Sequence, residues 1–144
     1  MNRELRELVW NRAGGCCEYC RMPQSLDPLP FEVDHVIATQ HHGETTADNL
    51  CVACFACNRR KGPNLAGRDE LTGALIPLFH PRRDEWETHF EWQGPTLLPH
   101  SRTPALPHYR TTATNGQTIG MTNMATIHNS TFSGTPTFTK SLKR

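Results

Sequence analysis

The sequence lacks long apolar runs. None of its 144 residues lies in a segment apolar for long enough to cross a membrane as a helix. The first ten residues, MNRELRELVW, alternate charged and apolar side chains, so the chain begins without the apolar core of a secretory signal peptide. We therefore expect a cytoplasmic protein with no membrane partner. In a reducing compartment, its six cysteines are more typical of metal ligands than of disulfides.

The C-terminal part of the chain lacks acidic residues. The whole chain carries 15 Lys and Arg against 14 Asp and Glu, a net charge of +1. Residues 1–92 hold all 14 acids but only 10 of the bases, a net charge of −4, whereas residues 93–144 hold five bases and no acid. We predict one folded domain over residues 1–92, followed by a Thr-rich, disordered tail over residues 93–144. The near-neutral total does not exclude a DNA substrate, but affinity for DNA must then come from a local basic patch.

Hydrophobic periodicity and glycine or proline breaks predict a small α+β domain. The expected elements, in chain order, are a helix over 2–12, a strand over 31–37, a second strand over 50–52, a helix over 54–61, a turn and strand over 69–76, and an aromatic-anchored helix or edge element over 83–92.

Two pairs of cysteines have the spacing of metal chelates. Cys17-x2-Cys20 and Cys54-x2-Cys57 can each supply two thiolates from one tight turn. Two such turns complete a tetrahedral four-sulfur site, so we predict a structural Zn²⁺ on these four side chains.

The sequence leaves three alternatives to this metal site. Cys51-x2-Cys54 is a second possible pair, and Cys16 adjoins the first knuckle, although we expect Cys16 and Cys51 to be free thiols. The six cysteines could instead form three disulfides, or the run of Cys51, Cys54 and Cys57 could hold an iron–sulfur cluster.

Polar residues at the ends of the predicted elements suggest a second, oxygen-ligated metal site. Asp34 and His35 lie at the end of the first strand, Asn49 opens the second strand, and Asn58 follows the last paired cysteine. Carboxylate and amide oxygens suit a hard divalent ion such as Mg²⁺, and an adjacent imidazole can deprotonate a water for attack on phosphorus. If zinc joins helix to strand, Asp34, His35 and Asn58 can converge on one exposed patch.

At this point the order and spacing of the motifs resemble a known family, the four-cysteine class of HNH endonucleases, over residues 3–92. The motifs that carry the resemblance are Cys17-Glu-Tyr-Cys20, Val33-Asp-His-Val-Ile37, His42-Gly43, Asp48-Asn-Leu50 and Cys54-x2-Cys57-Asn-Arg-Arg-Lys61.

The resemblance implies a role for each matching position. His35 corresponds to the general base, Asp34 to a metal ligand, Asn49 to the asparagine that holds the loop and so orients the histidine, and Asn58 to the last metal ligand. The implied fold is a zinc-stabilised ββα-metal finger, treble-clef-like, with flanking helices and a short hairpin. The implied reaction is hydrolysis of a DNA phosphodiester, by nicking or cleavage, with Mg²⁺ or Mn²⁺ as cofactor.

Basic residues next to this site are candidates for nucleic-acid binding. Arg59, Arg60 and Lys61 end the second helix, and His42 lies in the loop after His35. We predict that they contact DNA phosphates, although cations at a helix end can also be only a solvated face that the helix dipole favours. Two other functions stay open, a catalytically inactive zinc-stabilised nucleic-acid-binding module and a zinc scaffold that docks on protein.

Overall fold

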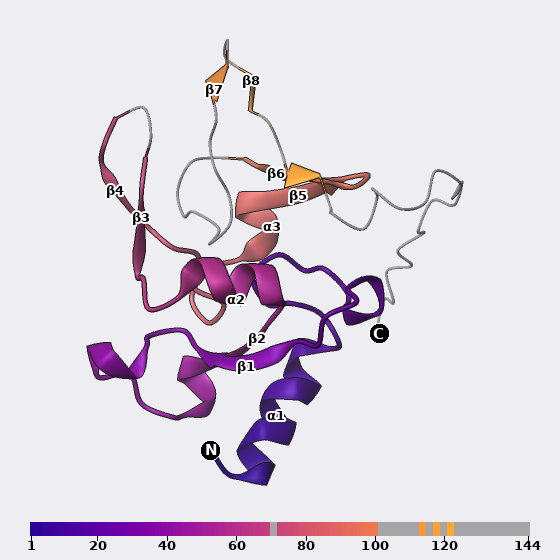
Figure 1. The fold of residues 1–144 in the computed structure, drawn as a ribbon, viewed down its shortest axis with the longest axis vertical. Helices are drawn as coiled ribbons and strands as arrows, with labels where there is room; N and C mark the ends of the chain where they lie inside the picture. Colours follow the sequence, from indigo (N-terminus) through magenta and orange to yellow (C-terminus); the bar gives the residue numbers. More distant parts are fainter. Residues whose placement is uncertain (70–71, 101–112, 115–116, 119–120, 123–144) are drawn as a thin grey trace, which may run out of the picture.

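The structure of the chain, a computed structural model, describes residues 1–69 and 72–100, and the backbone of three two-residue strands at 113–114, 117–118 and 121–122. The described chain is built of short helices and short strands (Figure 1). Among the described helices, none has the length and apolar character needed to cross a bilayer.

The first helix, α1 (Arg3–Ala13), has Asn2 as its N-cap and Gly14 as its C-cap. The Asn2 side chain caps the helix, because its oxygen accepts a 2.8 Å hydrogen bond from the Leu5 amide. Gly14 ends it in the left-handed conformation, with φ of 59°. Val9 and Ala13 form its buried face. In Figure 1, α1 lies on one side of the β1–β2 strand pair and α2 on the other.

Two antiparallel strands, β1 (Glu32–His35) and β2 (Leu50–Ala53), form the central hairpin, in which Asp34 lies opposite Cys51. All four residues of β2 are buried. β1 is shorter than the predicted strand over 31–37, because the amide of Ile37 donates to the Asn49 side chain and not to the strand ladder. Two 3₁₀ turns, η2 (Thr39–His41) and η3 (Ala47–Asn49), lie in the connection.

The second α-helix, α2 (Phe55–Lys61), follows β2 directly. Cys54 caps its N-terminus, with its sulfur accepting from the Cys57 amide at 3.4 Å, and Gly62 ends it. The predicted helix over 54–61 is confirmed.

After α2 the described chain consists of short hairpins and one helical turn, and one further 3₁₀ turn lies before β1. The remaining elements are η1 (Gln24–Leu26), β3 (Ala66–Arg68), β4 (Leu75–Pro77), α3 (Trp86–His89), β5 (Phe90–Gln93), β6 (Thr96–Pro99), β7 (Ala113–Thr114), β8 (Gln117–Thr118) and β9 (Met121–Thr122). The pairs are β3–β4, β5–β6, β6–β9 and β7–β8, all antiparallel.

The predicted domain boundary at residue 92 falls inside β5. β6 pairs with β5 beyond it, and Leu97 is only 1% exposed. The folded part therefore extends at least to Pro99, because an apolar residue of β6 completes the core. The rest of the predicted tail, apart from the three two-residue strands, lies outside the described residues.

The buried core joins the cysteine-rich knuckles to both ends of the described chain. The Phe90 ring packs against Phe79 and Trp86 in it, and the Phe79 and Phe90 rings lie edge to face with centroids 5.6 Å apart. The buried apolar side chains are Val9, Ala13, Cys17, Tyr19, Cys20, Phe31, Val36, Leu50, Cys51, Val52, Ala53, Cys54, Cys57, Phe79, Trp86, Phe90 and Leu97.

Candidate metal centre and reaction site

Four cysteines converge on one buried point. The Sγ atoms of Cys17, Cys20, Cys54 and Cys57 all lie within 4.8 Å of one another, and all four residues are buried. The Sγ atoms of Cys20 and Cys54 are 3.9 Å apart. Tetrahedral Zn²⁺ with bonds of 2.3 Å requires sulfurs about 3.8 Å apart. The four cysteines are therefore positioned to bind a metal, and their thiolate set and spacing fit zinc.

The geometry also decides between the alternatives for the cysteines. All six are free, and a sulfur separation of 3.9 Å is far longer than a disulfide bond of about 2.0 Å. Cys51 lies outside the cluster and donates through sulfur to the Asp34 carbonyl at 3.7 Å. Burial raises the pKa of the Cys51 thiol to about 12, so it stays protonated. The register with Cys57 is confirmed, and Cys16 and Cys51 are free thiols as predicted.

Each cysteine pair comes from a tightly folded turn. The amide of Cys17 donates to the Met22 carbonyl at 2.9 Å, and Arg21, with φ of 62°, turns the chain back after Cys20. Cys54 and Cys57 open α2. The cluster thus joins the segment before β1 to the start of α2.

His35 ends β1 and is held through one ring nitrogen. Its Nε2 lies 2.9 Å from the hydroxyl oxygen of Thr45, which belongs to the loop between η2 and η3. Thr45 lies outside every motif of the sequence, so no sequence pattern predicted this contact.

Asn49 fastens the loop that carries Thr45. Its Oδ1 accepts from the Ile37 amide at 2.8 Å, and its Nδ2 donates to the carbonyls of Ile37 and Glu44, each at 2.9 Å. A side chain with one acceptor and two donors thereby joins the two ends of the loop. Gly43 packs so closely against it that an added Cβ would lie 1.8 Å from the Ile37 oxygen and 2.8 Å from Asn49 Nδ2.

Two contacts join α2 to one face of β1. The Asn58 Nδ2 donates to a Glu32 carboxylate oxygen at 2.8 Å, and the Lys61 ammonium lies 3.6 Å from an Asp34 carboxylate oxygen. Glu32 and Asp34 share a face because side chains alternate along a strand, and Asn58 and Lys61 share a face three residues apart on a helix. The predicted ligands Asp34 and Asn58 therefore lie on facing elements, each engaged by another residue. Glu32 was not predicted as a site residue, although the alternation of side chains along the strand places it on the same face as Asp34.

Lys61 was predicted to contact phosphate, but its side chain is buried. Its side chain is only 2% exposed, and its Nζ donates to the backbone carbonyls of His35 at 2.8 Å and Gly62 at 3.0 Å. The ammonium is turned inward because these carbonyls and Asp34 satisfy its charge and its donors. The prediction for Lys61 is wrong.

The other predicted phosphate contacts lie on the surface. Arg59 and Arg60 are exposed on α2, and the Arg59 guanidinium lies 5.9 Å from the ring centroid of Phe55. His42 is exposed at the end of η2 in the left-handed conformation, with φ of 60°. Their contact with phosphate stays a prediction.

Comparison with known proteins agrees with this arrangement. Residues 17–64 match the HNH endonuclease family. The match, called the HNH segment below, begins at the first cluster cysteine, contains β1, β2 and α2, and ends just beyond α2. No curated protein and no solved structure matches the chain.

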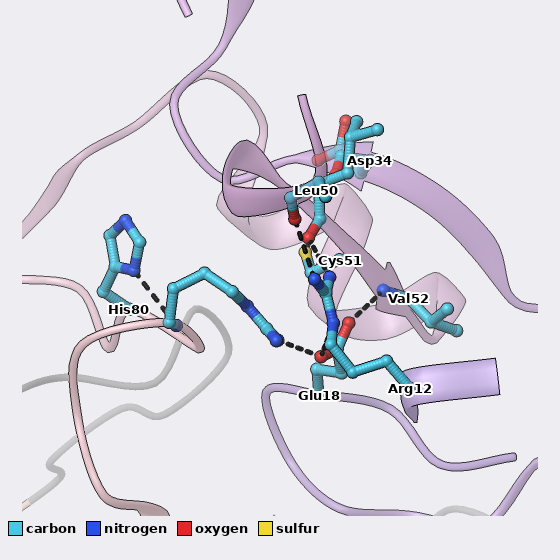
Figure 2. Close-up of polar contacts among 9 residues, drawn as sticks. Arg12, Glu18, Asp34, Leu50, Cys51, Val52 and His80 are labelled. Atoms are coloured by element: carbon cyan, nitrogen blue, oxygen red, sulfur yellow. Dashed lines mark hydrogen bonds and ion pairs between the residues drawn. The ribbon is translucent and has the colours of Figure 1, made fainter. Parts of the chain in front are cut away.

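A buried carboxylate ties the HNH segment to both of its flanks (Figure 2). Glu18, 5% exposed, accepts a 2.8 Å hydrogen bond from the Val52 amide on β2. It also pairs with Arg82 from the C-terminal flank and, at 3.5 Å, with Arg12 from α1. Arg12 donates further to the carbonyls of Ala47 and Leu50, at 2.8 and 2.7 Å. Glu18 lies between two cluster cysteines, so this network braces the HNH segment from outside.

Two tryptophans outside the HNH segment hold the same knuckle. Trp86 Nε1 donates to the Tyr19 carbonyl at 2.8 Å, and Trp92 Nε1 donates to the Cys20 carbonyl at 2.9 Å. They anchor the core, as predicted, and their indole donors are occupied.

Proposed function

We propose that the chain is a divalent-metal-dependent endonuclease of HNH type that hydrolyses DNA phosphodiester bonds. The observation that carries the proposal is the placement of Asp34 and His35 at the end of β1, with Asp34 on the strand face that Asn58 and Lys61 of α2 contact, inside a segment that matches the HNH endonuclease family.

The order of elements supports a ββα-metal finger. β1, β2 and α2 follow one another, and the cysteine cluster joins the start of α2 to the knuckle before β1. We assign a structural role to zinc at this cluster, because four protein ligands complete a tetrahedral site and leave no open position.

We assign His35 as the general base. In this assignment the Nε2 proton is donated to the Thr45 hydroxyl, 2.9 Å away, so that Nδ1 is the nitrogen that accepts a proton from the attacking water. Asn49 acts as a positioning residue, because it holds the Glu44 carbonyl directly before Thr45. A chain of contacts from Asn49 through the loop to His35 thus fixes the imidazole.

The oxygen donors near His35 suit a hard cation. Asp34 offers carboxylate oxygens, Asn58 uses Nδ2 and not Oδ1 in its contact with Glu32, and Glu32 adds a second carboxylate. A bound Mg²⁺ or Mn²⁺ would stabilise charge on the phosphate and the departing oxygen. Among the described residues, the four cysteines are the one group of three or more Cys, His, Asp and Glu side chains placed to hold a metal, and Asp34 is already paired with Lys61. Ion binding here therefore requires the Lys61–Asp34 pair to open.

The pairing of Asp34 with Lys61 favours the alternative function, an inactive zinc-stabilised nucleic-acid-binding module. Lys61 places a positive charge 3.6 Å from the Asp34 carboxylate, where a second cation would have to bind. The two functions separate clearly, because binding of DNA without cleavage in Mg²⁺, Mn²⁺ and other divalent ions would select the module.

A plasmid-nicking assay tests the proposal. We expect the wild-type chain to nick supercoiled DNA with Mg²⁺ or Mn²⁺, and His35→Ala to lose this activity while keeping its zinc. Equal residual nicking by both proteins would show that His35 is not the base.

A further inference from the structure

Two hollows adjoin beside the reaction site. The outer hollow, of 480 Å³, lies along the loop between β1 and β2, and the inner hollow, of 270 Å³, lies against the end of α2. Both are lined by Ile37, His80 and Arg83, so the hollows meet at these residues. Lys61, which bonds the His35 carbonyl, also lines the inner hollow. The meeting point therefore includes Ile37, two residues after the candidate base in the chain, but is built partly from outside the HNH segment.

The turn that presents Arg83 is fixed internally. The Asp84 carboxylate accepts from the His80 amide at 2.7 Å, and the amides of Arg83 and Asp84 both donate to the His80 carbonyl at 3.0 Å. The turn is also anchored on both sides, by the Arg82–Glu18 pair before it and by the bond from Trp86 to Tyr19 after it. A turn held in this way presents its exposed side chain at low entropic cost.

At the meeting point of the hollows, Arg83 is the cation whose charge is available to bind an anion. Lys61 is buried against carbonyls and Asp34, and Arg82 is paired with Glu18. Arg83 is exposed, and no hydrogen bond or ion pair of its guanidinium occurs within the part of the chain that the structure describes.

The remaining charges around the hollows favour phosphate binding at the meeting point over phosphate binding in the outer hollow. Glu44 and Asp48 line the outer hollow, where they would repel a phosphate. Asp84 is the carboxylate that lines the inner hollow, and the His80 amide occupies one of its oxygens. Burial, and then the positive charge of Arg83, lower the pKa of His80, so His80 adds no charge at neutral pH.

We propose that Arg83 binds a backbone phosphate of the DNA substrate where the two hollows meet, and so holds the strand beside His35. The inference rests on the proposed function and extends it, because it gives a substrate contact to the segment that follows the HNH match. A guanidinium suits this role, since its donors can bind two phosphate oxygens at once.

Binding of a labelled DNA duplex to the full chain, in Ca²⁺ over a series of salt concentrations, tests the inference. Arg83→Gln should weaken binding about 5- to 10-fold and lower the salt slope by about 0.9, the value for one lost phosphate contact. Arg83→Lys should stay within about 3-fold of the wild type, because it keeps the charge. Arg6→Gln is the matched control, since Arg6 is exposed on α1 and lines neither hollow.

The outcomes separate this inference from the proposed function. A wild type that neither binds nor nicks DNA overturns both. A wild type that nicks DNA, together with an Arg83→Gln variant of unchanged affinity and salt slope, overturns the Arg83 contact alone. An Arg83→Lys variant as weak as Arg83→Gln also contradicts a contact based on charge.

Discussion

The ammonium of Lys61 donates a 2.8 Å hydrogen bond to the backbone carbonyl of His35. This contact joins the last residue of α2 to the last residue of β1. A helix end rich in cations is usually solvated, yet here its last cation is buried at the centre of the candidate site. Lys61 thereby positions the candidate base through the main chain.

Replacing Lys61 by Met should destabilise the fold. The change keeps much of the side-chain length but leaves the His35 carbonyl without its donor, a loss of about 1–3 kcal/mol in the free energy of unfolding. Urea unfolding of the zinc-loaded protein measures it. Arg59→Met is the control, because Arg59 is exposed on the same helix and its loss should change stability by about 0.5 kcal/mol at most. Equal losses in both variants would contradict a specific role for Lys61.

Thr45 should control the orientation of His35 without contributing to DNA affinity. Thr45→Val removes the hydroxyl at constant shape, so we expect kcat to fall about 10- to 100-fold, the effect of a misplaced catalytic group. Thr45→Ser keeps the hydroxyl and should recover most of the activity. The nitrogen chemical shifts of His35 report its tautomer directly. Unchanged kcat and unchanged shifts in Thr45→Val would show that this contact does not position the ring.

Gly43 should be essential for the loop that Asn49 holds. A methyl group at residue 43 would overlap the Ile37 carbonyl, so Gly43→Ala should cost about 3 kcal/mol in the free energy of unfolding or displace the loop. Gly67→Ala is the matched control, because the nearest atom to its Cβ would be a Leu78 methyl carbon at 3.9 Å. Thermal unfolding compares the two, and similar melting temperatures would argue against the close approach at Gly43.

Metal analysis of single-cysteine variants tests the cluster. We expect one zinc per wild-type chain, retained in Cys51→Ala and lost in Cys57→Ala, because Cys57 belongs to the cluster and Cys51 does not. Since burial raises the pKa of Cys51 to about 12, its thiol should also react slowly with iodoacetamide at neutral pH. Loss of zinc from Cys51→Ala, with its retention by Cys57→Ala, would favour the alternative pair Cys51-x2-Cys54.

The features that sequence patterns predicted are those set by local spacing. The two cysteine pairs, the helix at Phe55–Lys61 and the strand end at Asp34 and His35 each follow from residues a few positions apart. Asn49 was identified by family resemblance, and its three hydrogen bonds to Ile37 and Glu44 agree with a loop-holding role.

The features that sequence patterns missed depend on contacts between distant segments. Whether Lys61 faces solvent or β1 is decided by how α2 packs, and helix-end composition does not contain that information. Glu18 looks like a surface acid within a knuckle, but Arg12 and Arg82, from opposite ends of the domain, bury it. Composition also placed the domain end at residue 92, whereas pairing with β5 extends the fold through β6.

The most direct test of the central claim is single-turnover cleavage of an end-labelled DNA duplex by the zinc-loaded chain with Mg²⁺. We expect metal-dependent cleavage by the wild type and by His100→Ala, a surface histidine outside the HNH segment, and a loss of at least about 100-fold in His35→Ala. Equal rates for His35→Ala and the wild type, or no cleavage by a wild type that binds the duplex, would contradict an HNH endonuclease with His35 as its base.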